Sequence, residues 1–387
     1  MIFERTISDS LKKLATQYPV ITLIGPRQSG KTTLTQQIFP HKDYVNLEEP
    51  DTLAFAVSDP RAFLERYPNG AILDEIQRAP VLLSYIQALV DKRPEKGLFI
   101  LTGSHQLALH AAITQSLAGR TALLTLLPLS LAELNAHVNL SLDELLLTGG
   151  YPRIYHDQLD PTQAYRNYLQ TYIERDVRQL IQLKDLLLFQ QFIKLCAGRV
   201  GQVTHFQNLS NELGVSGHTI KNWISILEAS FIIFQLPPYF ENLGKRTLKS
   251  PKLYFTDVGL ASYLLDIDST KQIQRDPLRG HLVENLFILE MMKYRLNRVL
   301  DPRLYYYRDN HQHEVDVIFK QGHELIPIEI KSAQTFHPSF LKTLNYFQKL
   351  VPNRCSRGFL IYAGEQEQTI EQWHILHYAH LDKIFEE

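Results

Sequence analysis

Cysteine is almost absent from this chain, which has only Cys196 and Cys355 among its 387 residues. Two isolated thiols offer no metal-binding spacing and give no reason to expect a disulfide-dependent fold. Long apolar runs are missing too: none has the length of a membrane span, and residues 1–22 lack the apolar core of a signal peptide. We therefore expect a globular protein that has no membrane partner and is located in the cytoplasm of a prokaryote-like cell.

A strong excess of either charge is also lacking. The chain has 40 lysines and arginines against 41 aspartates and glutamates, which gives a formal net charge of −1. A surface that binds nucleic acid must then be a local basic patch rather than a property of the whole molecule. The length leaves room for two or three domains, each with its own core.

The strongest local pattern is found in residues 21–33. An apolar run, residues 21–24, predicts a buried strand, and residues 34–38 predict a helix. Between them lies the phosphate-binding pattern G-x-x-x-x-G-K-[ST]. The residues that we expect to contact a nucleotide here are Gly25, Pro26, Arg27, Gln28, Ser29, Gly30, Lys31, Thr32 and Thr33.

The chemistry of phosphate binding explains this pattern. Gly25 and Gly30 allow backbone angles that wrap successive N–H groups around an anion, and the following helix points its N-terminal dipole at the same place. Lys31 can reach the β- and γ-phosphates of ATP, and the Thr32 hydroxyl can hold Mg²⁺. The alternative is a glycine turn that carries Lys-Thr by chance.

Two acids after a second apolar strand, residues 71–75, favour an ATPase over that alternative. Asp74 would hold Mg²⁺ through water, and Glu75 would polarise the attacking water. Adjacent acids alone are also common as surface charge, so the assignment depends on the phosphate loop. A third strand, residues 98–101, leads to Ser104 and His105, either of which could sense the γ-phosphate. A strand-end turn with polar caps stays an alternative for these two.

The alternation of strands and helices predicts an α/β fold with a parallel, helix-covered sheet and the nucleotide at the carboxyl ends of its strands. Arg120 is a candidate arginine finger or sensor, because a guanidinium beside the γ-phosphate stabilises transition-state charge. A surface arginine after a turn is the alternative. Residues 140–188 predict a helical lid, and the dense opposite charges in residues 172–178 indicate a solvated ion-pair face.

A different pattern begins near residue 189. Residues 206–213 and 217–229 predict two helices joined by a tight turn, which is typical of a helix-turn-helix. The start of the second helix offers base or phosphate contacts from His218, Thr219, Lys221 and Asn222. Two apolar strands follow, residues 231–236 and 252–256, so a winged helix is predicted.

The segment between these strands is basic. Residues 244–252 contain four basic residues and no acid, and we expect DNA backbone contacts from Lys245, Arg246, Lys249 and Lys252. Winged helices also dock proteins without touching DNA, and that alternative stays open.

The last part of the chain carries a nuclease-like arrangement. Asp316, twelve residues, Glu329, one residue and Lys331 match the D…E-x-K pattern of restriction-type nucleases. Residues two apart on a strand project to the same face, so Glu329 and Lys331 can meet Asp316 across a hairpin. The two carboxylates would bind Mg²⁺, Lys331 would face a phosphate, and Glu284 on a preceding helix could add a fourth group. A surface hairpin with alternating charge is the alternative.

The chain resembles the bacterial and archaeal AAA-type ATPases that carry a C-terminal winged-helix and restriction-endonuclease-like region. The resemblance covers nearly the whole length and implies ATP and Mg²⁺ as ligands, a homo-oligomer, and DNA binding that includes branched DNA. The motifs that carry it are residues 25–33, 73–77, 101–104, 116–120, 149–152, 172–178 and 244–246.

Four regions are therefore expected: an ATPase core (residues 1–139), a helical lid (140–188), a winged helix-turn-helix (189–270) and an α/β restriction-endonuclease-like domain (271–387). The leading hypothesis is an ATPase that uses its nucleotide state to act on DNA. The alternative is a regulatory or scaffold ATPase whose C-terminal regions bind a protein partner and have no nuclease activity.

Overall fold

The computed structural model describes residues 3–104, 116–172, 177, 186–239 and 250–386. None of the helices in this part of the chain combines the length and the apolar character that a membrane crossing needs. His105, Lys245, Arg246 and Lys249 lie outside the described residues, as does most of the charged segment 172–178.

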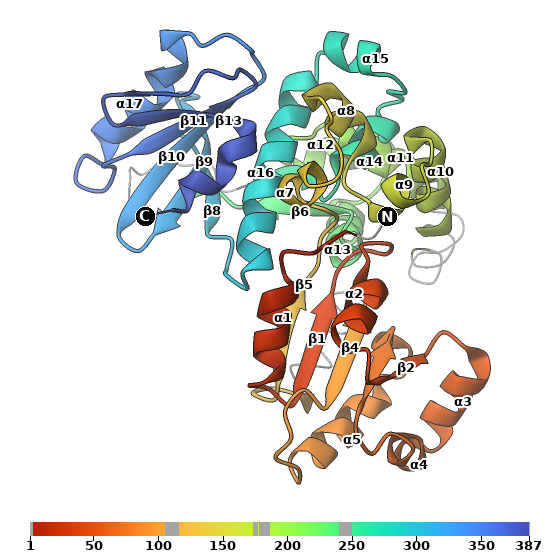
Figure 1. Cartoon of the computed structure of the whole chain (residues 1–387). Coiled ribbons are helices and arrows are strands. Elements are labelled where there is room, and N and C mark those ends of the chain that lie inside the picture. The colour runs from red at the N-terminus through yellow and green to blue at the C-terminus, as the bar shows by residue number, and fades with distance from the viewer. Residues whose placement is uncertain (1–2, 105–115, 173–176, 178–185, 240–249, 387) are drawn as a thin grey trace.

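A five-stranded sheet forms the N-terminal region (Figure 1). Its strands are β1 (Val20–Ile24), β2 (Asp43–Asn46), β3 (Ala71–Asp74), β4 (Phe99–Gly103) and β5 (Thr121–Thr125). They pair in the order β2-β3-β4-β1-β5, and every pair is parallel. All five strands therefore end at one edge of the sheet, where the phosphate loop follows β1, the two acids follow β3, and Ser104 follows β4.

Helices cover both faces of this sheet, as parallel sheets require. They are α1 (Ser8–Ala15), α2 (Lys31–Ile38), α3 (Pro50–Ser58), α4 (Pro60–Glu65), the short η1 (Ile76–Arg78) and α5 (Val81–Val90). Alternate residues of β1 enter two separate cores: Ile21 and Leu23 pack with Leu11 and Leu34, whereas Val20 packs on the other face. Strand β1 is buried along its length, so the loop that follows it starts from a fixed position.

The middle of the chain is mainly helical. Its helices are α7 (Leu131–Asn135), α8 (Leu142–Thr148), α9 (Pro152–His156), α10 (Pro161–Tyr172), α11 (Leu186–Ala197), α12 (Phe206–Leu213), α13 (Gly217–Ala229), α14 (Val258–Leu264) and α15 (Thr270–Arg275). Strands β6 (Ile233–Leu236) and β7 (Lys252–Phe255) form a two-stranded antiparallel sheet. Helices α12 and α13 have the bounds expected from the sequence and contact each other.

A six-stranded mixed sheet forms the C-terminal region. Its elements are α16 (Arg279–Asn297), β8 (Leu304–Arg308), β9 (Glu314–Gln321), β10 (Glu324–Lys331), η4 (Pro338–Leu341), α17 (Lys342–Leu350), β11 (Gly358–Tyr362), β12 (Gln368–Ile370), β13 (Trp373–His377) and η5 (Tyr378–Ile384). The strand order is β12-β13-β11-β10-β9-β8. Strands β8, β9 and β10 pair antiparallel, whereas β10, β11 and β13 run parallel.

Helix α16 connects the regions of the molecule. It packs on β10 of the C-terminal sheet and on the 3-10 helix η5, and it also contacts α14 and β5 (Figure 1). Because it has neighbours on several sides, even charged side chains of this helix, including Glu284 and Lys293, are buried. Each of them must therefore find a partner within the protein.

Candidate functional site

The loop after β1 has a backbone that its glycines permit. A Cβ on Gly25 would lie 2.1 Å from the carbonyl oxygen of Leu126, so no other residue fits there without a shift of the backbone. Gly30 has φ +93° and directly precedes α2, which starts at Lys31. The Ser29 hydroxyl is buried and has no hydrogen-bond partner among the described residues. A loop with this shape fits an anionic phosphate.

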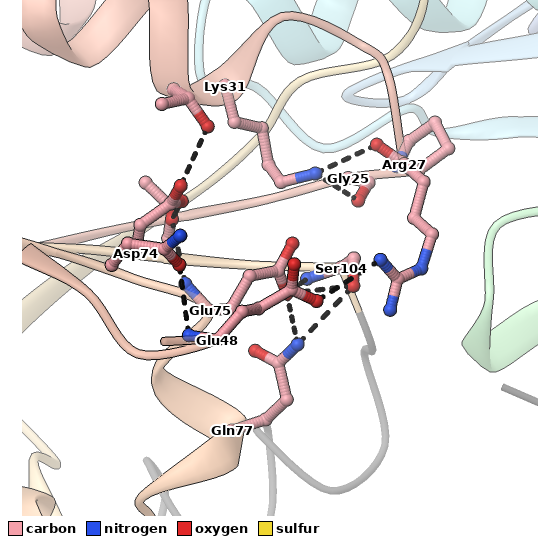
Figure 2. A network of polar contacts seen from close by, with 12 residues as sticks. Gly25, Arg27, Lys31, Glu48, Asp74, Glu75, Gln77 and Ser104 are labelled. Carbon is pink, nitrogen blue, oxygen red and sulfur yellow. Dashed lines mark hydrogen bonds and ion pairs between the residues drawn. The ribbon is translucent and has the colours of Figure 1, made fainter. Parts of the chain in front are cut away.

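Lys31 lies across this loop. Its Nζ donates to the carbonyl oxygens of Gly25 and Pro26 at 2.9 and 2.8 Å, as Figure 2 shows. The side chain is buried, which strengthens its attraction to a negative charge. The ammonium is thus held at the mouth of the loop, where the sequence predicts a phosphate contact.

Asp74 and Thr32 meet as the sequence predicts. The Thr32 hydroxyl donates to Asp74 Oδ2 at 2.9 Å, so the two groups that could share a Mg²⁺ ion are adjacent. Two further partners were not predicted: the Tyr44 hydroxyl donates to the same oxygen at 2.7 Å, and the Thr102 hydroxyl donates to Oδ1. Strands β2 and β4, which flank β3, supply these groups, a placement that only the strand order reveals.

Glu75 has a left-handed backbone, with φ +56°, an uncommon conformation for a residue other than glycine. Its Oε2 accepts hydrogen bonds from the Ser104 hydroxyl at 2.9 Å, from the Ser104 backbone N–H at 3.3 Å, and from the Gln77 side chain (Figure 2). Burial raises the pKa of Glu75, but the Lys31 charge and the Gln77 hydrogen bond outweigh it and leave the pKa below its ordinary value. Glu75 is therefore an ionised carboxylate near neutral pH.

A cavity of about 710 Å³ lies over the loop, within the usual range of about 300–1,000 Å³ for small-molecule sites. It is lined by Phe3, Arg5, Arg27, Gln28, Gly30, Lys31, Thr32, Thr33, Leu34, Gln37, Glu75, Leu129, Pro152, Arg153, His156, Asp157 and Thr171. Helix α9 and the end of α10 therefore border the cavity. The residues present fit a nucleotide with Mg²⁺: a phosphate cradle, a lysine, and a hydroxyl beside a carboxylate.

Two arginines of this cavity were missed by the sequence analysis. Arg5 is buried and donates to the carbonyl oxygens of Ser29 and Leu127, both at 2.7 Å. Arg153 lies on α9, at the lid side of the cavity, and its Nε is 3.0 Å from Asp157 Oδ2. Arg5 precedes any recognisable motif and carries no signal. Arg153 follows the Gly-Gly-Tyr-Pro segment, which could have pointed to it.

Arg120 lies away from its own chain's cavity. It directly precedes β5, and its carbonyl oxygen accepts from Val20 at the start of β1, so it lies at the edge of the sheet opposite the phosphate loop. Its guanidinium pairs with Asp91, with Nε 2.5 Å from Oδ1 and Nη2 2.8 Å from Oδ2. Arg120 therefore does not line the cavity of its own chain, and a role across a subunit interface stays a prediction.

Comparisons with known proteins agree with this geometry. Residues 17–135 match the family described as AAA domain, and residues 139–271 and 279–381 match two domains of unknown function, DUF8612 and DUF4143. The uncharacterized proteins Mb2031c of Mycobacterium bovis and Rv2008c of Mycobacterium tuberculosis are each 30% identical over 369 residues, which cover 94% of this chain and 81% of theirs. The chain belongs to the family of these two proteins. Its N-terminal region is an AAA-type P-loop ATPase domain.

A solved structure is similar as well. The Walker-type ATPase PABY2304 of Pyrococcus abyssi aligns with a TM-score of 0.45 and 16% identity, over 68% of this chain and 96% of that one.

The residues predicted to contact DNA fall into three groups in the structure. His218, Lys221 and Asn222 are exposed on the first turns of α13, and Thr219 is half-buried beside the helix cap Ser216. Lys245, Arg246 and Lys249 lie outside the described residues. The assignment of a winged helix stays a prediction, since the matching family has no described function.

Lys252 forms the third group and requires a correction. Its side chain is only 2% exposed, and its Nζ lies 2.9 Å from Glu284 Oε1 and 2.5 Å from Glu314 Oε1. An ammonium enclosed by two carboxylates does not reach a phosphate on the protein surface. The expectation that Lys252 contacts the DNA backbone is therefore wrong, because the residue starts β7 inside the protein rather than ending an exposed wing.

The nuclease-like residues come together. Strands β9 and β10 pair antiparallel with Val317 opposite Ile328, which brings Asp316 beside Glu329. Lys331 Nζ lies 2.5 Å from Glu329 Oε1, and the Ile330 backbone N–H donates to Asp316 Oδ2 at 2.8 Å. Glu329 Oε2 is buried without a hydrogen-bond partner among the described residues. We call Glu284, Glu314, Asp316 and Glu329 the carboxylate cluster.

The cluster has an uneven charge distribution. Burial and the Glu284 charge raise the pKa of Asp316 to about 6, and burial and the Asp316 charge raise the pKa of Glu329 to about 8. Burial acts in the same direction on Glu284, but Lys252 overrides it and lowers the pKa of Glu284 to about 2. Within the described residues, no three histidine, cysteine or acidic side chains converge closely enough to hold a metal ion. Asp316 and Glu329 would need water or substrate oxygens to complete a Mg²⁺ site.

Proposed function

We propose that this protein hydrolyses ATP and uses its nucleotide state to act on DNA. The observation that carries the first half is the position of Glu75, an ionised carboxylate held by Ser104 and Gln77 at the wall of the cavity above the phosphate loop. A base with this placement can orient water and accept its proton. The AAA domain match over residues 17–135 supports the same reaction.

Each part of the loop then has a role. The backbone of residues 25–33 and the Lys31 ammonium would bind the phosphates, and Thr32 with Asp74 would hold Mg²⁺. When bound, Mg²⁺ offsets the negative charge that the phosphate oxygens carry. Lys31 would then exchange its two carbonyl contacts for phosphate contacts, which are stronger because both groups are charged.

Glu75 is the residue that we propose to activate the attacking water. Its carboxylate would hold the attacking water and take up its proton, and Ser104 would keep the carboxylate aimed at that water. Because the pKa of Glu75 is lowered by Lys31 and its hydrogen bonds, it is ready to accept a proton at neutral pH without an activating step.

An ATPase assay on the full chain tests this proposal. Lys31→Ala should abolish nucleotide binding, whereas Glu75→Gln should keep it and lower turnover by about 100-fold or more. Lys96→Ala, an exposed lysine outside the cavity, serves as the control for loss of a positive charge. Wild-type turnover in the Glu75→Gln protein would contradict the role of Glu75.

The proposed DNA contact rests on the exposed polar face of α13, with His218, Lys221 and Asn222, and on the basic segment that the sequence places between β6 and β7. Binding of duplex, forked and four-way DNA across a salt series tests it. Phosphate contacts make affinity fall as salt rises, by a slope of about 0.9 per contact on duplex DNA. No binding to any of these substrates at low salt would favour a protein partner instead.

For the carboxylate cluster, we propose a phosphodiester site in which Asp316 and Glu329 would bind Mg²⁺ and Lys331 would face the phosphate. The Glu329 Oε2 atom, which has no hydrogen-bond partner among the described residues, supports this, since an unpartnered buried carboxyl oxygen is costly. A cation bound there would displace the proton that Glu329 holds near neutral pH and would satisfy this oxygen. Incubation with branched and linear DNA and Mg²⁺ or Mn²⁺, beside an Asp316→Ala control, tests cleavage. DNA binding without cleavage by either protein would leave a site that binds but does not react.

A further inference from the structure

Lys252 brings a positive charge from one region of the protein into the carboxylate cluster of another. It starts β7, which pairs with β6 in the two-stranded sheet and bridges to Val203, whereas Glu284 belongs to α16 and Glu314 to β9. Its Nζ lies 2.9 Å from Glu284 Oε1 and 2.5 Å from Glu314 Oε1. With 2% of the side chain exposed, these two carboxylates take the place of water around the ammonium.

The carboxylates on this side of the cluster are fully engaged. Glu284 Oε1 also accepts a hydrogen bond from the Tyr254 hydroxyl, and Glu314 Oε2 lies 3.3 Å from an Arg308 nitrogen. The ammonium acts as a compact point charge with three donors, and it meets the negative charge here as a small cation would. Removing it would leave the buried Glu284 carboxylate without its main partner, whereas the half-buried Glu314 would keep Arg308.

The other side of the cluster has the Lys331 ammonium as its cation. Glu329 keeps an unpartnered oxygen among the described residues, and only the Lys331 ammonium pairs with its other oxygen. Lys252 also influences Asp316, because its charge lowers the pKa of that carboxyl while Glu284 raises it. The positive charge of Lys252 therefore acts on Asp316, a proposed metal ligand, as well as on Glu284.

We propose that the Lys252 ammonium occupies the cation position of Glu284 in the carboxylate cluster, so that the cluster binds a divalent metal ion only when Lys252 is withdrawn. The inference rests on the proposed phosphodiester site, since it concerns the same carboxylates. A divalent ion beside Asp316 and Glu329 would be repelled by the buried Lys252 ammonium, which already neutralises Glu284. A movement of β7 relative to α16 would then exchange the Lys252 ammonium for a divalent metal ion from solution.

Binding of Mn²⁺ alone, in the absence of nucleotide, tests this proposal on the full chain. Mn²⁺ is detected by electron paramagnetic resonance and by the change in melting temperature. We expect wild-type protein to show no binding that depends on Glu329. Lys252→Met should gain one Mn²⁺ per chain, at least about tenfold more tightly than wild type, because a repelling charge is removed while the carboxylates remain.

Matched variants assign the gain to this cluster. Lys252→Met with Glu329→Gln should lose the new Mn²⁺ site, and Lys252→Arg, which keeps the positive charge, should behave as wild type. The double variant Lys252→Met with Glu284→Gln removes both members of the buried pair and leaves Glu314 with Arg308. It should therefore fold even where the single variant fails. Its Mn²⁺ binding should be weak, because the negative charge of Glu284 is lost.

The wild-type measurement does not depend on any lysine variant folding. Mn²⁺ binding by wild type that Glu329→Gln abolishes would overturn the proposal, as would a folded Lys252→Met protein that binds no Mn²⁺. Either result leaves ATP hydrolysis and DNA binding, which are measured separately, untouched. Conversely, an inactive ATPase with the expected Mn²⁺ pattern would reject the proposed function of the loop and keep this inference.

Discussion

The Ser104 hydroxyl donates to Glu75 Oε2 at 2.9 Å, although the two residues are 29 positions apart in the sequence. Strand β4 ends beside β3 in the sheet, so the two polar side chains emerge next to each other. Figure 2 shows both of them with Gln77 beside the loop that carries Lys31. Ser104 therefore holds the Glu75 carboxylate in place.

Replacing this hydroxyl should affect turnover more than binding. For Ser104→Ala we expect kcat to fall by about tenfold or more, with ATP affinity changed less than about threefold, since Glu75 loses an orienting hydrogen bond and Lys31 keeps its own. Steady-state ATPase kinetics and nucleotide titration measure the two effects. Ser84→Ala, an exposed serine on α5, is the control. Equal losses in kcat and in affinity would show that Ser104 supports the fold of the site instead.

Arg120 gives a prediction about assembly. In an oligomer it would reach the γ-phosphate of a neighbouring subunit, so Arg120→Ala should lower turnover while nucleotide affinity changes little. Asp91→Ala removes its partner within the chain and separates the two explanations, because a purely structural ion pair would make both variants behave alike. The pair is exposed and contributes little to stability in either case.

A mixing experiment completes this test. Arg120→Ala combined with Lys31→Ala should recover part of the hydrolysis, because the mixed oligomer contains intact loops beside intact arginines. Failure to recover any activity, where mixed oligomers are demonstrated, would argue against action across an interface.

The proposed DNA contacts make a salt-dependent prediction. Neutralising Lys245, Arg246 and Lys249 together should weaken binding to all sequences alike and reduce the salt slope by up to about one for each side chain that touches a phosphate. Lys252 is excluded from this set because it is buried against Glu284 and Glu314. A triple variant that binds DNA as tightly as wild type would favour the protein-docking alternative.

The sequence predicted the parts of the protein whose chemistry is local. The phosphate loop, the acids after β3 and the two helices α12 and α13 were all found from short patterns with a physical reason. The order of strands in the sheet could not be read from such patterns, and so the approach of Tyr44 and Thr102 to Asp74 was missed. The same limitation explains Lys252, whose basic neighbours suggested an exposed wing.

Long-range contacts made by α16 were invisible for a similar reason. Lys293 donates to the Leu129 carbonyl oxygen, and Glu290 accepts from the Leu131 backbone N–H, both across more than 150 positions. Charged residues in a helix usually indicate a solvated face. Here they are buried because three regions of the protein surround the helix, which no local pattern reports.

The carboxylate cluster predicts a dependence of stability on pH. The pKa of Glu329 is raised to about 8, from about 4.3 in an unfolded chain, so between these values the folded protein holds a proton that the unfolded chain has lost. Folding stability should therefore fall as pH rises from about 4.3 to 8, by up to about 1.4 kcal/mol per pH unit for this one group.

Glu329→Gln removes that proton equilibrium. The difference in melting temperature between this variant and wild type should therefore shift in favour of the variant as the pH rises from 5 to 8. Melting temperatures of both proteins at both pH values measure this difference. Glu365→Gln, an exposed glutamate, should leave the pH dependence unchanged. If the stability difference between wild type and Glu329→Gln were the same at pH 5 and pH 8, Glu329 would not be held neutral in the folded state.

The last prediction concerns Asp257, which ties the lid to the helices behind it. Its Oδ2 accepts from the Gly150 backbone N–H at 2.7 Å, and its Oδ1 accepts from the Tyr165 hydroxyl at 2.6 Å. The same carboxylate caps α14 through the Leu260 N–H at 3.1 Å, and the residue is buried. Gly149 and Gly150 lead directly into Pro152 and Arg153, which line the nucleotide cavity, so Asp257 holds the lid side of that cavity.

Asp257→Asn should weaken both the fold and the nucleotide site. The asparagine amide presents one N–H₂ group where a carboxylate oxygen accepted, so at least one buried donor loses its partner, at about 1–3 kcal/mol of stability. Nucleotide affinity should fall as the turn at Gly149–Gly150 loosens. Tyr165→Phe removes a single hydrogen bond to the same carboxylate and should have a smaller effect, about 1 kcal/mol. Thermal unfolding with and without nucleotide measures both, and an Asp257→Asn protein that loses stability yet binds ATP as wild type would show that the lid is positioned by other contacts.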